Sequence, residues 1–137
     1  MGRLSEIRND VEAMTKGIWV PFEVGIQCKI ARLYNDEHTQ CLAELNEQYS
    51  DLLESAKTKK EKTEIERHIF RESVARTILT DWKNLDDDDG SPISHNVEKA
   101  LELFEDPRYR DFYDFVIETA MQRHLYREKA KRAKAKN

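Results

Sequence analysis

The sequence predicts a mainly helical domain with a small N-terminal β element, that is, an α+β fold of amphipathic helices packed in one domain. Three observations lead to this prediction. The spacing of apolar residues changes once, near Asn35, from strand-like alternation to the three- and four-residue steps of a helix. The chain has only 4 Gly and 3 Pro, which favours a few long elements over many short strands. Its 137 residues are enough for one domain and too few for two independent cores.

The first residues of the chain, 1–17, form a polar opening segment, for which we expect an N-terminal arm or a short helix. The apolar residues of this segment follow helical steps of three and four: Leu4, Ile7, Val11 and Met14.

Residues 18–34 are dense in β-branched and aromatic side chains and predict the β element. Apolar residues alternate with polar ones at Ile26, Cys28 and Ile30. This pattern predicts two strands, or one strand that bends around Gly25. Because Pro21 has no backbone N–H to donate, the first strand should lie at a sheet edge or be interrupted there.

Helical spacing begins after Asn35, which together with Asp36 can supply an oxygen that caps a helix over 36–55. A charged connection at 57–62, either a solvated loop or the exposed first turn of the next helix, leads to a second long helix, which we expect to reach Leu85. Both helices are amphipathic, so each should bury one face.

The strongest break in the sequence is the run 86–92, in which four aspartates precede Gly, Ser and Pro. After it, Ser94 or Asn96 can cap a short helix, and Asp106–Pro107 interrupts the helical pattern. A final helix should follow this interruption. We therefore expect a single mainly helical domain over 18–125, with its β segment at 18–34.

The charge is divided unevenly along the chain, whose formal net charge is −4. The last twelve residues, 126–137, hold six basic residues and one acidic residue, giving +5 there and −9 over the rest. We expect these residues to form a basic flexible tail. The acidic body would repel nucleic acid, so nucleic acid is not the partner that we expect first.

No stretch of the sequence is apolar enough to span a bilayer or to act as a signal peptide. We therefore expect a soluble, intracellular protein that has no membrane partner. In a reducing compartment, Cys28 and Cys41 should be free thiols, since their spacing matches no metal site.

The sequence shows no motif that carries catalysis or binds a cofactor. The aspartate run does not fit a calcium-binding loop, because Leu85 and Asn96 stand where that loop needs ligands. Glu64 and His68 lie four residues apart on a predicted helix, which is more typical of a surface hydrogen bond than of an acid/base pair. We therefore expect no catalytic residues, no metal, no cofactor and no enzymatic activity.

Most aromatic residues of the helical region follow core-facing stripes, and we expect them to be buried: Trp82, Phe104, Phe112 and Phe115. Trp19 and Phe22 are different because they flank Pro21. One regular strand cannot place both on the same face, so one of them can be exposed to bind a partner. A bend at Pro21 that buries both residues is the alternative.

Several short segments, in their order along the chain, resemble the tail assembly chaperones of long-tailed bacteriophages and prophages. These segments are Trp19–Gly25 (WVPFEVG), Lys29–Asn35 (KIARLYN), Val74–Leu85 (VARTILTDWKNL), Asp89–Ser94 (DGSPIS) and Asp106–Pro107. The similarity covers most of 19–127, and residues 1–16 depart from the pattern.

The resemblance implies a chaperone that binds the long, helical tape measure protein and helps recruit tail tube subunits during tail morphogenesis. Such a protein acts in the host cell cytoplasm, is absent from the mature virion, and uses no cofactor. Self-association is compatible with this role. The alternative from another class is a small accessory protein that binds nucleic acid through its basic C-terminal tail.

Overall fold

The computed structural model describes residues 1–128, and its centre is a three-stranded antiparallel sheet. The strands are β1 (Ile18–Pro21), β2 (Gln27–Ile30) and β3 (Leu79–Lys83), in the order β1-β2-β3. Val20 pairs with Cys28, which pairs with Trp82 on its other side. The structure thus has two separate strands in the N-terminal β element, with Pro21 on the edge strand as predicted.

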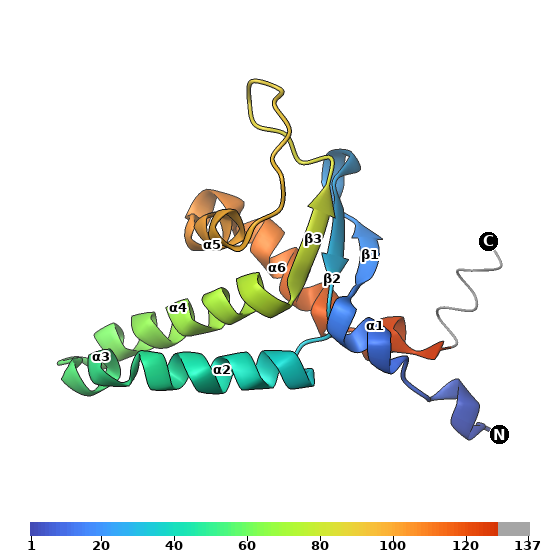
Figure 1. Cartoon of the computed structure of the whole chain (residues 1–137), viewed down its shortest axis with the longest axis horizontal. Helices are drawn as coiled ribbons and strands as arrows, with labels where there is room; N and C mark the ends of the chain where they lie inside the picture. Colours follow the sequence, from blue (N-terminus) through green and yellow to red (C-terminus); the bar gives the residue numbers. More distant parts are fainter. Residues whose placement is uncertain (129–137) are drawn as a thin grey trace.

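Six α-helices accompany this sheet within residues 1–128 and confirm the predicted mainly helical α+β fold. They are α1 (Val11–Lys16), α2 (Asp36–Gln48), α3 (Ser50–Ser55), α4 (Lys59–Thr77), α5 (Val97–Glu105) and α6 (Arg110–Ala120). Short 3-10 turns lie at Leu4–Glu6, Glu23–Gly25, Pro107–Tyr109 and Arg123–Tyr126. In Figure 1, α2 and α4 form a hairpin that projects away from the sheet, while α6 packs behind the strands.

Side-chain caps fix where the helices begin. The Asn35 side chain accepts a hydrogen bond from the His38 N–H at the start of α2, as the sequence predicted. For α5, the two candidates were Ser94 and Asn96, and the structure selects Asn96, which accepts from the Lys99 N–H. The Asp106 side chain accepts from the Arg108 N–H, so the chain turns there before α6 begins.

The second long helix is shorter than the sequence predicts, and the predicted end at Leu85 is wrong. It ends at Thr77, and the following residues form β3 instead of a further helical turn. The spacing of the apolar residues up to Trp82 and Leu85 fits a helix. The pairing of β3 with β2 instead satisfies the backbone hydrogen bonds of this segment and overrides that local pattern. The predicted helix 36–55 is also divided, because α2 ends at Gln48 and α3 starts at Ser50.

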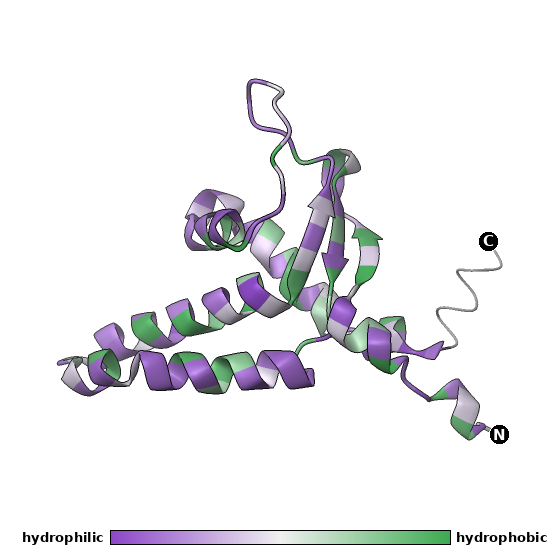
Figure 2. Cartoon of the chain, viewed as in Figure 1, coloured by the Kyte–Doolittle hydropathy of each residue, from purple (hydrophilic) through white to green (hydrophobic). Residues whose placement is uncertain are grey.

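The main core lies between the sheet, the C-terminal half of α4, α5 and α6. Its fully buried members include Cys28, Ile30, Val74, Ile78 and Val116. A second, smaller cluster of Cys41, Leu45 and Ile69 joins α2 to α4 inside the hairpin. Figure 2 shows the amphipathic character of these helices, which carry apolar and polar residues side by side.

The aromatic residues predicted to be buried lie mostly in this core. Trp82 is 5% exposed, and its indole Nε1 donates to the Ile93 carbonyl at 2.7 Å. Phe104 and Phe112 are also buried, whereas Phe115 is only half-buried.

Backbone hydrogen bonds join the N-terminal segment to residues 126–128. The Asp10 N–H donates to the Tyr126 carbonyl at 2.8 Å, and the Glu128 N–H donates to the Arg8 carbonyl at 3.0 Å. The Tyr126 ring is fully buried and its hydroxyl donates to the Ile30 carbonyl. The basic tail that we predicted for 126–137 therefore starts with a residue inside the protein, and 129–137 lie outside the described residues.

Candidate functional site

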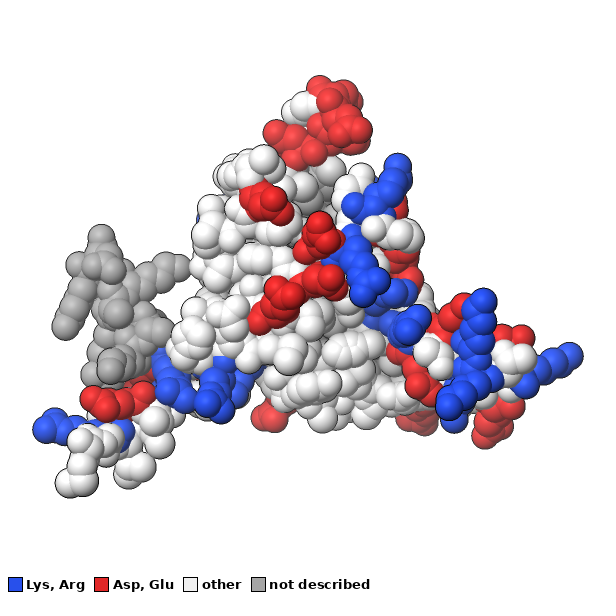
Figure 3. Space-filling model, turned by 180° about the vertical axis from the view of Figure 1, so that it is seen from behind, with Lys and Arg blue, Asp and Glu red and all other residues white. Residues whose placement is uncertain are grey.

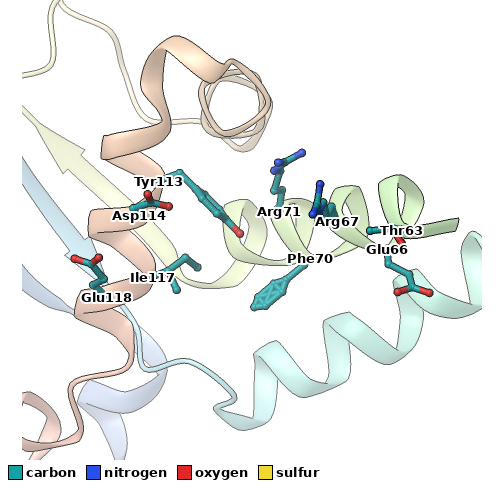
Figure 4. Close-up of a pocket in the computed structure, with 9 residues that line it drawn as sticks. All are labelled: Thr63, Glu66, Arg67, Phe70, Arg71, Tyr113, Asp114, Ile117 and Glu118. Atoms are coloured by element: carbon teal, nitrogen blue, oxygen red, sulfur yellow. The ribbon is translucent and has the colours of Figure 1, made fainter. Parts of the chain in front are cut away.

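A concave surface that carries both apolar and charged groups lies between α4 and α6. It has a volume of about 700 Å³. Figure 4 shows its lining, which comes from α4 on one side and α6 on the other: Thr63, Glu66, Arg67, Phe70, Arg71, Tyr113, Asp114, Ile117 and Glu118. We call this surface the α4/α6 groove.

The floor of the α4/α6 groove is apolar and consists of Phe70, Tyr113 and Ile117, which are all half-buried. The Phe70 ring packs edge-on against the His38 ring, with centroids 5.7 Å apart. The Tyr113 ring packs against Phe104 at 5.0 Å. Burial raises the pKa of Tyr113, so this side chain stays neutral at physiological pH. The floor is therefore an uncharged surface that the core holds in place.

The rim of the groove is charged. Arg71 forms an ion pair with Glu105 of α5 at 3.0 Å, and Asp114 is 3.6 Å from Arg110. Arg67 and Glu118 are exposed, and neither has an ion-pair partner within residues 1–128. Figure 3, which views the molecule from behind, shows acidic and basic side chains next to one another on this face.

A buried histidine supports the floor from below. His38 is fully buried, its Nδ1 accepts from the Tyr34 N–H at 3.0 Å, and its Nε2 lies 2.9 Å from Ser73 Oγ. Because Nδ1 is the acceptor, Nε2 carries the proton and donates to Ser73, which in turn donates to the Phe70 carbonyl. Burial lowers the pKa of His38 to about 4, so the ring is neutral near pH 7. This network joins α2 to α4 directly beneath Phe70.

A second polar cluster joins α4 to α5 and to the end of α2. His68 contacts Glu105 through Nδ1, and its Nε2 lies 3.2 Å from Glu72 Oε1. The Tyr49 hydroxyl donates to Glu72 at 3.0 Å, and Arg76 pairs with the other Glu72 oxygen at 2.7 Å. The partners of His68 are therefore Glu72, Glu105 and the Tyr49 hydroxyl, which lies 3.1 Å from Nε2, and not Glu64. The contacts of His68 with Glu105 and of Tyr49 with Glu72 link α4 to α5 and to the end of α2, whereas the His68–Glu72 and Arg76–Glu72 pairs lie within α4. The contacts between elements indicate a structural role.

Trp19 and Phe22, the two residues predicted as candidates for partner binding, do not line the groove. Phe22 is half-buried and packs against the rings of Phe112 and Phe115 at 5.5 and 4.7 Å. Trp19 is half-buried, with Lys83 Nζ 4.1 Å from its ring centroid. Both rings are thus partly covered, Trp19 beside Lys83 of β3 and Phe22 against α6, and partner binding by either residue stays a prediction.

The aspartate run forms a turn that projects from the sheet and is visible as the acidic tip in Figure 3. Its hydrogen bonds are internal, since the Asp87 N–H donates to the Ser91 carbonyl and the Gly90 N–H donates to the Asp87 carbonyl. Among residues 1–128, no group of three or more His, Cys, Asp or Glu side chains is arranged to hold a metal ion. Cys28 and Cys41 are both buried free thiols, and burial raises the pKa of Cys28 to about 12.

Comparison with protein families gives a match over residues 33–137 to the family described as YdaY prophage protein. The chain belongs to this YdaY family. The match supports the phage or prophage origin implied by the sequence resemblance. Comparison with curated proteins and with solved structures finds no match.

The region shared with the YdaY family contains the whole α4/α6 groove, whereas β1 and β2 precede it. Across the described part of this YdaY family member, no helix is both long and apolar enough to cross a membrane.

The sequence did not predict Tyr113 and Ile117 as floor residues, because they lie beside the core-facing apolar stripe of α6 and not on it. One signal was nevertheless present. Arg67/Arg71 and Asp114/Glu118 are like-charged pairs four residues apart, which destabilise an isolated helix. Two such pairs on facing helices of this YdaY family member mark the groove.

Proposed function

We propose that this member of the YdaY family is a tail assembly chaperone that holds an apolar helical segment of the tape measure protein in the α4/α6 groove. The observation that carries the proposal is the groove itself, whose half-buried floor of Phe70, Tyr113 and Ile117 is bordered by charged residues. An amphipathic helix can place its apolar stripe on such a floor. The resemblance of the sequence to tail assembly chaperones supports the same role, and the family match supports the phage or prophage origin that this role requires.

Burial of apolar surface provides the binding energy in this proposal. Apolar area removed from water contributes roughly 25 cal/mol per Å², and this contribution does not depend on charge. The charged rim keeps the exposed surface soluble when the groove is empty. Binding through the groove should therefore persist at high salt, unlike binding through a basic tail.

The remaining parts of the role follow from the same proposal. The protein acts without enzymatic activity, metal or cofactor, in the host cell cytoplasm, and leaves before the mature virion is complete. The tape measure protein and the tail tube protein are its partners, and self-association is compatible with this role. Trp19 and Phe22 are candidates for the contact with tail tube subunits, because they lie outside the groove.

Co-expression with the tape measure protein of the same prophage tests this function. The wild-type chain should keep the tape measure protein soluble and co-purify with it in about 1 M NaCl, where the Debye length is about 3 Å. Ile117→Arg places a charge on the groove floor and should reduce the co-purified amount by about tenfold, as expected when one apolar contact is lost. Met121→Arg is the matched control, since Met121 is exposed on the turn that ends α6.

The nucleic-acid alternative is tested in the same experiment by deletion of residues 129–137, which leaves buried Tyr126 in place. A chaperone complex should survive this deletion. Loss of the complex upon deletion or at high salt, with Ile117→Arg unaffected, would contradict the groove and favour binding through the tail.

A further inference from the structure

The two sides of the α4/α6 groove carry opposite charges. On α4, Arg67 and Arg71 are four residues apart and form a basic stripe beside the floor, with Glu66 as an acidic neighbour. On α6, Asp114 and Glu118 have the same spacing and form an acidic stripe on the other side. Figure 4 shows these side chains on the two helices, on either side of the apolar floor residues.

The outermost member of each stripe is available to a ligand. Arg67 and Glu118 are both exposed, and neither is engaged in an ion pair within residues 1–128. The inner members differ, because Arg71 pairs with Glu105 and Asp114 lies near Arg110. Among the charges that are unpaired within residues 1–128, a helix on the floor would therefore meet Arg67 and its acidic neighbour Glu66 on the α4 side, and Glu118 on the α6 side. Arg67 is the positive charge among these three.

A bound amphipathic helix presents two flanks, one on each side of its apolar stripe. If both flanks carried the same charge, one flank would repel the rim that it faces. If the flanks carried opposite charges, each could face the rim of opposite sign. The helix would then bind in the one of its two orientations along the groove that places the flanks in this way. Complementary charge affects the choice of partner more than the total affinity.

We propose that the α4/α6 groove selects a client helix whose apolar stripe is bordered by acidic residues on one flank and basic residues on the other. The acidic flank faces Arg67 and the basic flank faces Glu118. This inference rests on the proposed function, because it specifies the chemistry of the segment that the groove binds.

Three designed peptides test this selectivity against the full chain. Each is a fluorescein-labelled helix of about five turns, or about 18 residues, with the same leucine stripe. The flanks carry Glu on one side and Lys on the other in the first peptide, Lys on both sides in the second, and Glu on both sides in the third. Fluorescence anisotropy at about 0.15 M NaCl, where the Debye length is about 8 Å, gives the three dissociation constants.

The wild-type chain should bind the mixed peptide roughly two- to fivefold more tightly than either uniform peptide, which is the range of exposed ion pairs. Arg67→Glu replaces the unpaired positive charge of the α4 rim by a negative charge and should shift the preference to the all-Lys peptide. Glu118→Lys replaces the unpaired negative charge of the α6 rim by a positive charge and should shift the preference to the all-Glu peptide. Lys60→Glu and Glu47→Lys are the matched controls, because both residues are exposed and lie outside the groove, and both should keep the wild-type preference.

The outcomes separate this inference from the proposed function. Equal binding of all three peptides by the wild-type chain would leave the apolar groove in place and overturn the charge selectivity. An unchanged preference in Arg67→Glu and Glu118→Lys would also overturn it. Failure of all three peptides to bind would overturn the groove as a helix site, and the charge selectivity with it.

Discussion

At the scale of single residues, Trp82 makes the clearest contribution to stability. It is 5% exposed, lies on an edge strand of the sheet, and donates its indole N–H to Ile93. Trp82→Ala should therefore lower the free energy of unfolding by about 3–5 kcal/mol, because it leaves a large cavity. Urea unfolding followed by far-ultraviolet circular dichroism measures this loss. A loss below about 1 kcal/mol would show that the ring is not part of the core.

His38 makes stability depend on pH. Its pKa is lowered to about 4 by burial in the folded protein, against about 6.5 in the unfolded chain. The unfolded state therefore binds a proton first as the pH falls, and His38 disfavours folding increasingly between about pH 6.5 and pH 4. Between pH 7 and pH 5, the loss from this one group is on the order of 2 kcal/mol.

His38→Gln removes this titration, because an amide can bond to Ser73 without a charge. Urea unfolding of both proteins at pH 7 and pH 5 provides the comparison. The difference in unfolding free energy between the two pH values should be smaller in His38→Gln by about 2 kcal/mol. Equal differences in the two proteins would show that another group carries the pH dependence.

At the scale of elements, helix starts and the polar turn were predictable because their signals are local. Asn35, Asn96 and Asp106 each accept a backbone N–H from within the next three residues, so a short sequence window contains the whole interaction. The boundary at Thr77 was not predictable in this way. The strand after it depends on pairing with β2, which lies about fifty residues earlier in the chain.

The groove could be predicted only in part for the same reason. The amphipathic character of α4 follows from its sequence, but the position of α6 beside it depends on tertiary packing. Local spacing could place Phe70 on the apolar stripe of its helix, whereas the meeting of Phe70 with Tyr113 and Ile117 needed the fold. The sign of the charge on each rim can be predicted from the sequence, whereas the position of the two rims opposite one another cannot.

The cap of α5 gives a test of the element boundaries. Asn96→Ala should cost about 1 kcal/mol of stability, because the Lys99 N–H loses its acceptor. Ser94→Ala is the matched control and should change stability by less than about 0.5 kcal/mol, as an exposed substitution does. Thermal unfolding of the two variants distinguishes them, and an equal loss in both would contradict the assignment of Asn96 as the cap.

At the scale of the whole molecule, the fold depends on residues that lie before the region matched to the YdaY family. The central strand β2 precedes residue 33, and its Cys28 and Ile30 are fully buried in the main core. The N-terminal segment also pairs with the backbone around Tyr126 and Glu128. The N-terminal residues therefore contribute fully buried side chains to the main core.

Expression of residues 33–137 without the preceding segment tests this dependence. The shortened chain should lose its cooperative thermal transition and its near-ultraviolet circular dichroism signal, because β3 has no strand beside it and Trp82 loses its packing. A cooperative transition close to that of the full chain would show that the sheet is dispensable.

Hydrogen exchange of the full chain, alone and in complex with the tape measure protein, tests the central claim most directly. Binding in the α4/α6 groove should slow exchange in peptides that contain residues 63–71 and 113–118, since a client helix covers both walls. Peptides that contain Trp19 and Phe22 should keep their exchange rates. Protection confined to Trp19 and Phe22, or to residues after 128, with 63–71 and 113–118 unchanged, would contradict the account.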